Sequence, residues 1–381
     1  MSKLEELLNE LCPNGVEYRK LEDCCNVLDR KRKPITKAAR EAGEYPYYGA
    51  NGIQDYIADY IFDGKFILVG EDGSVITPTG TPVVNWAEGK IWVNNHAHII
   101  EEIDGVLLRY LYHYLQTIDV TPLIHGNIPK LTGGDFKALQ IPVPPLEVQR
   151  EIVHILDNFT ELTAELTAEL TARKKQYEFY RNKLLTFDNN VKIVPLADIA
   201  DIGTGSSNTN EGLEEGKYPF YVRSQEPLRK NEYEYDETAI ITAGDGVGVG
   251  KVFHYIEGKY ALHQRAYRIH INTPDVLPRY YFHYMRAAFL PYIQKTMFQG
   301  SVASVRRPML NKFPVPVPPL DTQKRLVNVL DNFESICTDL NIGLPAEIEA
   351  RQKQYEYYRD LLLTFAAEGA TILTDRQTGN N

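Results

Sequence analysis

A glycine-rich segment that ends in a lysine, Gly244–Lys251, is the first feature of the sequence that could do chemistry. Loops of this kind can cradle phosphate groups, but a nucleotide loop needs another glycine five residues before the one next to the lysine, and serine or threonine after the lysine. Those two positions hold Asp245 and Val252. We therefore predict a glycine-rich hairpin between two strands, with Glu71–Ser74 as the corresponding tight turn in the first half.

Two histidines, His96 and His98, alternate along a predicted strand and should therefore share one of its faces. Zinc could use such a pair, but no third ligand is close in the sequence. Because Asn94 and Asn95 precede the pair, we favour polar contacts with bases or phosphates over purely structural hydrogen bonds. In the second half, His263–Arg265 occupies a similar place and carries groups suited to adenine and guanine edges.

The segment Gly300–Arg307 is the strongest single candidate for a DNA contact. Its small hydroxyl residues would let the backbone approach closely, and its two arginines could reach phosphate or guanine. The counterpart in the first half runs from His125 to Lys130. The complete set of candidate DNA-binding residues is Lys31, Arg32, Lys33, Asp72, Ser74, Asn94, Asn95, His96, His98, His125, Asn127, Lys130, Arg223, Ser224, Asp245, His263, Gln264, Arg265, Ser301, Ser304, Arg306 and Arg307.

The net charge of -10 is unfavourable for binding a polyanion, but the charges are unevenly distributed. Between Pro278 and Phe313 the sequence has no acidic residue and six basic ones, and Arg30–Lys33 is a second basic run. A short basic run can equally be a solvated loop. These two segments predict local phosphate-binding surfaces on an acidic chain.

The length of 381 residues allows two or three domains, and 43% of hydrophobic residues is typical of globular proteins. No apolar run approaches the roughly 18 residues of a membrane span, and the start of the chain lacks the pattern of a secretory signal. We expect a cytoplasmic protein without membrane contact. The four cysteines form no C-x-x-C pair, so we expect reduced structural thiols.

The chain contains one helical segment twice. Residues 173–187 return at 351–365 with eleven of fifteen positions identical. Ile141–Phe159 returns as Val315–Phe333 with eleven of nineteen positions identical. Upstream of these copies the similarity thins to short matches. Each half therefore joins a diverged globular part to a repeated helical part.

The two globular parts contain short β-branched and aromatic runs, such as Lys65–Val69 and Thr238–Thr242, bounded by turn-forming residues. These runs predict strands joined by tight turns. Helices are predicted near 105–117 and 277–290. The predicted fold class is therefore α+β, with two mixed α/β domains.

Long helices are predicted to follow the proline pairs at 144–145 and 318–319. Apolar residues at three- and four-residue steps predict a first helix of about 44 residues, or about 65 Å. A helix of that length needs a partner, and the second copy is the obvious one. We expect an antiparallel, coiled-coil-like pair with an approximate two-fold relation between the halves, and a kink near 341–345 because Gly343 and Pro345 lie there.

A resemblance to a known family covers essentially the whole chain. It is carried by the Pro-Val-Pro-Pro-Leu-x-x-Gln segments at 142 and 316, the Arg-x-Lys-Gln-Tyr-Glu-x-Tyr-Arg segments at 173 and 351, and the Thr-Ala-Glu-Leu units at 163–166 and 167–170. The chain resembles the specificity subunit of type I restriction-modification systems, and the tetrapeptide units are similar to those of the type IC subgroup. Each unit adds about 6 Å of helix and keeps its leucine close to one face.

The resemblance implies two target recognition domains, 1–143 and 189–317, each of which reads one half of a bipartite, gapped site in double-stranded DNA. It also implies that the helices at 144–188 and 318–366 set the gap and dock two methyltransferase subunits for adenine N6 methylation. Restriction subunits would join this core in host defence. Residues 367–381 are predicted to be a polar tail. The candidate spacer and partner-binding residues are Phe159, Leu162, Leu166, Leu170, Tyr177, Tyr180, Phe333, Tyr355, Tyr358 and Phe365.

We expect no catalytic residue, no cofactor and no metal site. An adenine methyltransferase would need an Asn/Asp-Pro-Pro-aromatic loop, whereas leucine follows the proline pairs here. One alternative is a free-standing DNA-binding regulator, which would not co-purify with a modification subunit. Another alternative is an enzyme that uses Gly244–Lys251, and nucleotides would then stabilise the protein against heat.

Overall fold

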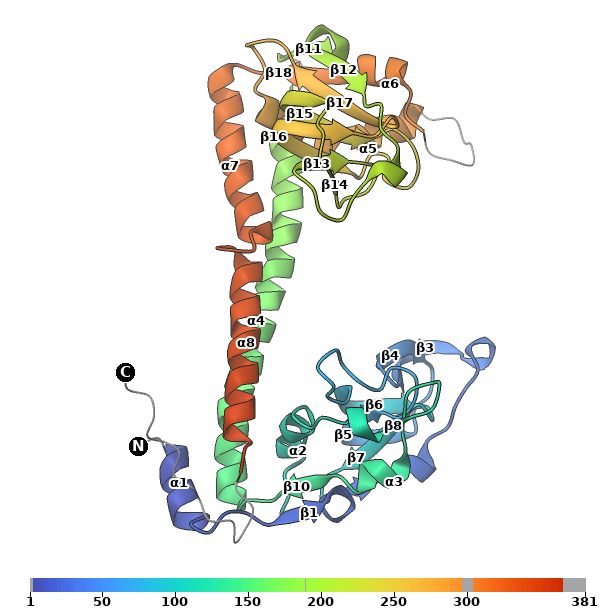
Figure 1. The fold of residues 1–381 in the computed structure, drawn as a ribbon, viewed down its shortest axis with the longest axis vertical. Helices are drawn as coiled ribbons and strands as arrows, with labels where there is room; N and C mark the ends of the chain where they lie inside the picture. The colour runs from blue at the N-terminus through green and yellow to red at the C-terminus, as the bar shows by residue number, and fades with distance from the viewer. Residues whose placement is uncertain (1–2, 189, 297–303, 366–381) are drawn as a thin grey trace. The chain divides into compact units, whose positions relative to one another are not determined.

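The computed structural model describes residues 3–188, 190–296 and 304–365, and the chain divides into two compact units (Figure 1). Unit 1 comprises Met1–Glu165 and Ile348–Asn381, and unit 2 comprises Leu166–Glu347. Ser301 and the segment 367–381 lie outside the described residues. Each unit combines one mixed α/β part with two stretches of long helix.

Unit 1 is built on a six-stranded sheet with the strand order β2-β7-β5-β6-β3-β4. Neighbouring strands are antiparallel except for the parallel pair β3 and β6. Alternate residues of β5 face opposite sides, so Ile67 packs in the cluster that contains α2, whereas Leu68 joins a second apolar cluster. The elements are α1 (Lys3–Leu11), β1 (Tyr18–Lys20), β2 (Asn26–Val27), β3 (Ala42–Gly49), β4 (Gly52–Ile57), β5 (Phe62–Gly70), β6 (Val84–Val93), β7 (Ala97–Glu101), α2 (Leu108–Leu115), β8 (Ile124–His125), β9 (Lys130–Leu131), α3 (Gly133–Lys137) and β10 (Gln140–Pro142).

Unit 2 repeats this architecture with the strand order β12-β17-β15-β16-β13-β14. The parallel pair is again the fourth and fifth strand of the sheet, and β11 with β18 corresponds to β1 with β10. This repetition confirms the predicted fold class of two mixed α/β domains. The elements are β11 (Lys192–Pro195), β12 (Ala200–Thr204), β13 (Tyr218–Tyr221), β14 (Leu228–Lys230), β15 (Tyr235–Ala243), β16 (Phe253–Leu262), β17 (Ala266–Ile271), α5 (Pro278–Thr296), α6 (Arg307–Asn311) and β18 (Pro314–Val317).

The long helix α4 (Leu146–Leu184) is unbroken over 39 residues and belongs to both units, whereas the second copy consists of α7 (Leu320–Thr338) and α8 (Leu344–Leu362). Between α7 and α8, the carboxylate of Asp339 accepts hydrogen bonds from the N–H groups of Asn341 and Ile342. None of the helices among the described residues is long and apolar enough to cross a membrane.

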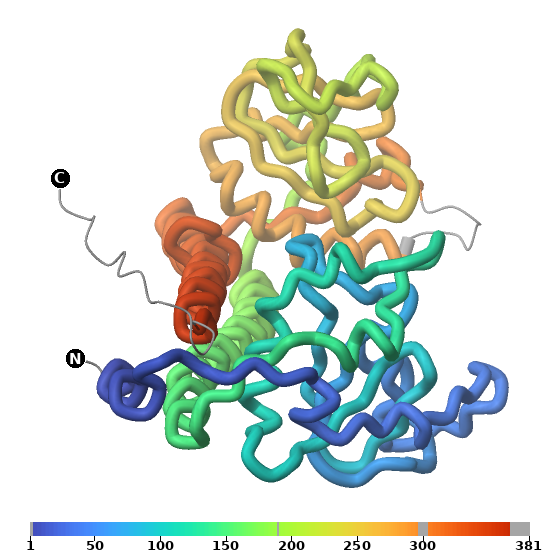
Figure 2. Tube along the Cα trace, turned by 60° about the horizontal axis from the view of Figure 1, so that its bottom comes forward, coloured from blue at the N-terminus to red at the C-terminus, as the bar shows by residue number. Residues whose placement is uncertain are grey.

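The helix pairs are antiparallel within each unit. In unit 1, the ring of Phe159 stacks on Tyr358 with centroids 5.3 Å apart, and the hydroxyl of Tyr18 donates to the carbonyl of Phe365. Because Tyr18 pairs with Pro142, just before α4, the end of α8 lies beside the start of α4 (Figures 1 and 2). This arrangement agrees with the pairing expected from the repeat.

Unit 2 shows the same direction for α7 and the second part of α4. The rings of Tyr180 and Phe333 stack with centroids 6.0 Å apart. Just after the end of α4, Phe187 contacts Tyr280, whose hydroxyl donates to the carbonyl of Pro316 just before α7. The end of α4 therefore lies near the start of α7.

A buried glutamine joins the start of α4 to the globular part of unit 1. The side-chain oxygen of Gln149 accepts a hydrogen bond from the N–H of Leu107 at 2.9 Å. Its side-chain nitrogen donates to the carbonyls of Gly105 and Pro144, at 3.0 and 2.8 Å. The glutamine of the Pro-Val-Pro-Pro-Leu-x-x-Gln segment is thus fully used in fixing the helix to the domain.

The same clamp recurs in unit 2 at the start of α7. Gln323 is also fully buried, and its oxygen accepts from the N–H of Leu277 at 2.8 Å. Its nitrogen donates to the carbonyls of Asp275 and Pro318, both at 2.8 Å. The repeated segment therefore encodes one structural joint that is used twice.

A buried histidine makes a second link between the globular part and the helices of unit 1. Nε2 of His113 lies 2.8 Å from the carboxylate of Asp157, which also accepts from Nε of Arg109 at 2.7 Å. Nδ1 of His113 lies 2.9 Å from the hydroxyl of Tyr355 on α8. Burial lowers the pKa of His113 below its ordinary value, although the aspartate acts in the opposite direction.

In unit 2, His283 repeats this link with the carboxylate of Asp331, at 2.7 Å, and burial again lowers the pKa of the histidine. Arg279 donates to the same oxygen at 2.8 Å. Among the described residues, however, neither Nδ1 of His283 nor the hydroxyl of Tyr177 has a hydrogen-bond partner. Tyr177 corresponds to Tyr355 in the repeat, so the two units differ in this tyrosine contact.

Replacing Gln149 or Gln323 by alanine should lower the free energy of unfolding by about 1–3 kcal/mol, because each change leaves an N–H and two carbonyls without their partner. Urea denaturation followed by circular dichroism measures the effect. The matched control is Gln352→Ala on the exposed face of α8, which should cost less than about 0.5 kcal/mol. Equal losses for Gln149→Ala and Gln352→Ala would contradict the clamp.

Acidification should destabilise the protein from near-neutral pH downwards. Burial lowers the pKa of His113 and His283 in the folded state, so the unfolded chain takes up protons first as the pH falls through about 6.5. The contribution of the two neutral histidines to the free energy of unfolding is complete above their pKa in the unfolded chain. It is lost as the pH falls towards their lower pKa in the folded protein. Denaturation at about pH 8 and about pH 5.5 measures this loss.

A double variant, His113→Gln with His283→Gln, separates these two histidines from the other titrating groups. It should lose less stability than the natural chain between the two pH values. An equal loss in both proteins would show that the linked protons bind elsewhere.

Candidate nucleic-acid interface

Three segments that the sequence analysis singles out meet at one place in unit 1. The N–H of Glu71 donates to the carbonyl of His96 at 2.9 Å, and the carbonyl of Glu71 accepts from the N–H of Leu131 at 2.9 Å. Asp72 and Lys130 form an isolated antiparallel bridge next to these bonds. The β5–β6 turn, the residues before β7 and the β8–β9 hairpin thus form one surface.

Unit 2 brings the corresponding segments together with the same backbone contacts. The N–H of Gly244 donates to the carbonyl of Arg265 at 2.9 Å, and the carbonyl of Gly244 accepts from the N–H of Val305 at 2.8 Å. Asp245 and Ser304 form the isolated bridge. The surface around the turn is therefore duplicated, although few of its residues are identical.

An aspartate in each turn holds the side chain of a histidine or an arginine. Asp72 pairs with Nδ1 of His96 in unit 1. In unit 2, Asp245 lies 3.1 Å from Nη1 of Arg265 and 2.5 Å from Nη1 of Arg223. Burial alone would raise the pKa of Asp245, but the two arginines outweigh it and lower that pKa. The carboxylate is therefore ionised at neutral pH.

The backbone N–H of His96 and that of Arg265 are each fixed by the side chain two positions earlier. Oδ1 of Asn94 accepts from the N–H of His96 at 2.8 Å, and Nδ1 of His263 accepts from the N–H of Arg265 at 2.9 Å. Asn94 and His263 are both buried. The sequence analysis placed both among the DNA-binding residues, but the structure gives them a supporting position beneath the surface.

His98 does not share a face with His96, so the sequence prediction of two imidazoles side by side is wrong. β7 begins at Ala97, which leaves His96 in the preceding turn and buries His98. Nδ1 of His98 lies 2.7 Å from Asp29, and its Nε2 lies 3.0 Å from the carbonyl of Leu131. With both ring nitrogens engaged inside unit 1, His98 cannot contact a base.

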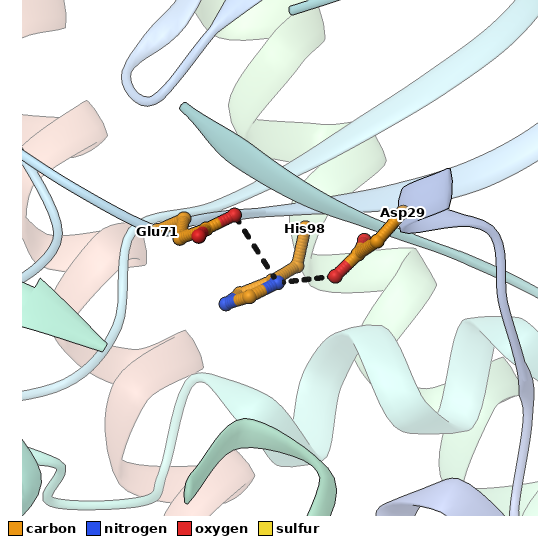
Figure 3. Close-up of side chains that lie close together, drawn as sticks. All are labelled: Asp29, Glu71 and His98. Atoms are coloured by element: carbon orange, nitrogen blue, oxygen red, sulfur yellow. Dashed lines mark hydrogen bonds and ion pairs between the residues drawn. The ribbon is translucent and has the colours of Figure 1, made fainter. Parts of the chain in front are cut away.

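Figure 3 shows the carboxylates of Asp29 and Glu71 both directed at one ring nitrogen of His98, Nδ1. The three side chains could each offer one ligand atom to a metal ion. However, Arg32 lies 2.6 Å from one oxygen of Glu71, and Lys130 lies 3.2 Å from the other. Because two cations already neutralise these carboxylates, we interpret the group as a structural anchor and not as a metal site.

The basic run Arg30–Lys33 of unit 1 is held in place by the contacts of Arg32 with this anchor. Arg32 is largely buried and donates to the carbonyl of Ala97 at 2.5 Å as well as to Glu71, so its predicted DNA contact is not supported by its position. Lys31 and Lys33 on either side are exposed. Sequence reasoning missed the structural role of Arg32, because no local pattern connects this arginine to Glu71 and Ala97 farther along the chain.

The remaining candidates lie on or near the surface. Asp72, Arg223 and Asp245 are partly buried, and Arg307 also donates to the carbonyl of Ile202. The exposed candidates are Lys31, Lys33, Ser74, Asn95, His96, His125, Asn127, Lys130, Ser224, Gln264, Arg265, Ser304, Arg306 and Arg307.

The glycine-rich segment forms the turn between the antiparallel strands β15 and β16, as the sequence predicts. Gly246 has φ of 81°, a conformation that strongly favours glycine. A Cβ atom on Gly244 would lie 2.7 Å from the carbonyl oxygen of Arg265. The glycines therefore let this turn pack against the arginine segment.

Most of the residues predicted to form the spacer are partly buried along the repeated helices, and Tyr180 is exposed. Tyr177 and Tyr355 are buried, and the leucines of the tetrapeptide units are half-buried. The most exposed aromatic residues of these helices are instead Phe179 and Tyr357, with exposed fractions of 61% and 65%. They occupy equivalent positions of the repeat, which the sequence alone could not separate from the buried tyrosines beside them.

Comparison with known proteins gives matches over both halves. A family model described as the type I restriction modification DNA specificity domain matches residues 13–173 and again 188–350. A putative type I restriction enzyme specificity subunit of Haemophilus influenzae is 35% identical over 390 residues, which cover 95% of this chain and 98% of that protein. The EcoR124I/EcoR124II specificity subunit of Escherichia coli is 35% identical over 291 residues, which cover 68% of this chain and 71% of that protein.

The solved structures include a similar fold. The S subunit of a type I restriction-modification system from M. genitalium matches with a TM-score of 0.60 and 16% sequence identity, over 92% of this chain and 96% of that chain. A structure from a study of complex assembly and conformational transition of the type I system matches with a TM-score of 0.57, over 92% and 98%. At this level of identity the likeness concerns the fold.

Replacing Arg32 by alanine should lower the free energy of unfolding by about 1.5–3 kcal/mol, because Glu71 then loses a charged hydrogen-bond partner in a largely buried place. The neighbouring Lys31→Ala should change it by no more than about 0.5 kcal/mol, because Lys31 is exposed. Scanning calorimetry of the two variants compares them directly. If both variants unfolded at the same temperature as the natural chain, Arg32 would not be part of an anchor.

Proposed function

The chain belongs to the family of type I restriction-modification DNA specificity subunits, and on this premise we propose that it selects the DNA sequences on which such a complex acts. One observation carries the proposal: the same surface is built twice, with an exposed hydrogen-bonding side chain, His96 or Arg265, held against an aspartate in each unit. Two reading surfaces on one chain suit a target made of two short sequences.

Residues 1–143 and 189–317 would be the two target recognition domains, and each would read one half of a bipartite site. Exposed polar side chains around Asp72 and Asp245 would contact base edges in the major groove. His96 in unit 1 stands where Arg265 stands in unit 2, and Lys130 stands where Ser304 stands. The two half-sites should therefore differ in sequence.

Phosphate contacts would come from exposed cations at the rim of each surface. Lys31 and Lys33 supply them in unit 1, and Arg306 supplies one in unit 2. These contacts would set the register on the duplex without reading its sequence. The net charge of -10 does not oppose this proposal, because phosphate attraction depends on the charges near the surface.

The helical regions 144–188 and 318–366 would set the unread gap between the half-sites. α4 is unbroken from one unit into the other, so each Thr-Ala-Glu-Leu unit adds about 6 Å of rise between the two halves of the chain. The assignment to the type IC subgroup rests on this tetrapeptide and stays a prediction.

The relatives are specificity subunits, and this chain works in the same way with the other subunits of a restriction-modification complex and with DNA. We propose that two methyltransferase subunits dock on the repeated helices and supply adenine N6 methylation, and that restriction subunits join this core. Phe179 and Tyr357 support two equivalent docking places, because exposed aromatic residues are common anchors of protein interfaces.

Deleting one tetrapeptide unit, residues 163–166, should shorten the unread gap by about one or two base pairs and leave both half-site sequences unchanged, because about 6 Å of helix is removed. Sequencing of N6-methyladenine in cells that express the variant with its modification subunits gives both quantities.

The matched control for length is Glu165→Gln, which changes the exposed face of the same unit without changing the helix. It should leave the gap as it is. A deletion that altered a half-site sequence while keeping the gap length would contradict the proposal. A natural chain that directed no methylation in the complex would also contradict it, because that is the behaviour of a free-standing regulator.

A further inference from the structure

We propose that His96 and Arg265 occupy equivalent specificity-determining positions, at which the side chain reads a base edge while Asp72 or Asp245 positions it. In unit 2 the base is a guanine, and in unit 1 it is a base that offers one hydrogen-bonding group to an imidazole. This inference rests on the proposed function, and it assigns particular residues to the reading step.

The first step is the equivalence of the two positions. The turn donates a backbone N–H to the carbonyl of His96 or Arg265, and a buried acceptor two residues earlier, Asn94 or His263, fixes their own N–H. The geometry is thus kept although the acceptor and the central side chain both change. A position whose surroundings are fixed and whose side chain differs is suited to setting which base is read.

The second step separates base reading from phosphate binding. Phosphate contacts gain their free energy from local positive charge. Asp245 removes part of that charge, since it lies 2.5 Å from Arg223 and 3.1 Å from Arg265. The pair of Asp72 and His96 carries no net positive charge even when the imidazole is protonated. A carboxylate beside the cation weakens attraction to phosphate, but it fixes the orientation that a base contact requires.

The third step concerns the atoms that remain available. Arg265 uses Nη1 for Asp245, and among the described residues its Nε and Nη2 have no hydrogen-bond partner. The side chain is 61% exposed, so its planar fork can donate two bonds to O6 and N7 of guanine. His96 is 47% exposed and offers only Nε2, which likewise has no partner in the described part of the chain. Unit 2 should therefore discriminate more sharply at its base pair than unit 1.

The test uses the full-length chain in complex with its modification subunits and maps N6-methyladenine by long-read sequencing. Arg265→Lys keeps the charge but removes the planar fork. It should reduce the preference for guanine at one position of one half-site by about ten-fold or more, with the other half-site unchanged. Arg265→Ala should act at the same position. Lys259→Ala removes an exposed charge elsewhere in unit 2 and should leave the motif unchanged.

A second set of variants tests the positioning role of Asp245 and Asp72. Asp245→Ala should relax the same base position as Arg265→Lys, and Asp245→Glu should restore part of the preference, because a longer carboxylate can still hold the arginine. Asp72→Ala should relax one position of the other half-site only. Each unit thereby serves as the control for the other.

Two results would overturn the inference alone. One is an unchanged motif in Arg265→Lys and Arg265→Ala. The other is a uniform loss of methylation at all sites in Arg265→Ala that Arg265→Lys rescues, which is the behaviour of a phosphate contact. If the natural chain directed no bipartite methylation, the proposed function would fail and this inference with it.

Discussion

A buried glutamine that must satisfy all of its polar atoms fixes how each globular part is seated on its helix. Gln149 and Gln323 each accept one bond and donate two, in directions set by a planar amide. An unpaired buried group costs more free energy than a formed bond contributes, so other seatings are disfavoured. Within each unit, the proposed reading surface around Asp72 or Asp245 therefore has a defined orientation toward the helix that begins at the clamp.

The proposed reading surface of unit 1 has a comparable support in its ion pairs. Asp29 holds His98, and Glu71 holds Arg32 and Lys130, so the basic run and the turn at Asp72 are fixed together. Several residues that look like ligand contacts in the sequence are in this way part of the support. The exposed side chains that we propose to contact DNA project from a framework in which Asp29, Glu71 and Arg32 are already paired.

The features that sequence reasoning predicts well are those set by local patterns. The strands, the long α4 and the glycine-rich turn follow from periodicity and turn residues over short stretches, and the motifs of the repeat identify the family. The positions of His98 and Arg32 could not be predicted in this way. His98 is buried by a partner 69 positions away, and His113 is bonded to a tyrosine 242 positions away. Such contacts form only in the folded chain. The local sequence around a histidine near a strand is the same whether its side chain is buried or exposed.

The two halves have diverged in a way that separates support from reading. The aspartate of the turn, the backbone bonds around it and the glutamine clamp are present in both units, whereas the exposed residue beside the aspartate is a histidine in one and an arginine in the other. A substitution at that exposed residue changes its contact with the aspartate but leaves its backbone hydrogen bonds in place, because those bonds use only main-chain atoms of this residue. The recognised sequence can therefore change with little cost in stability, which is what a chain needs when its task is to choose among DNA sites and its helices must remain the same.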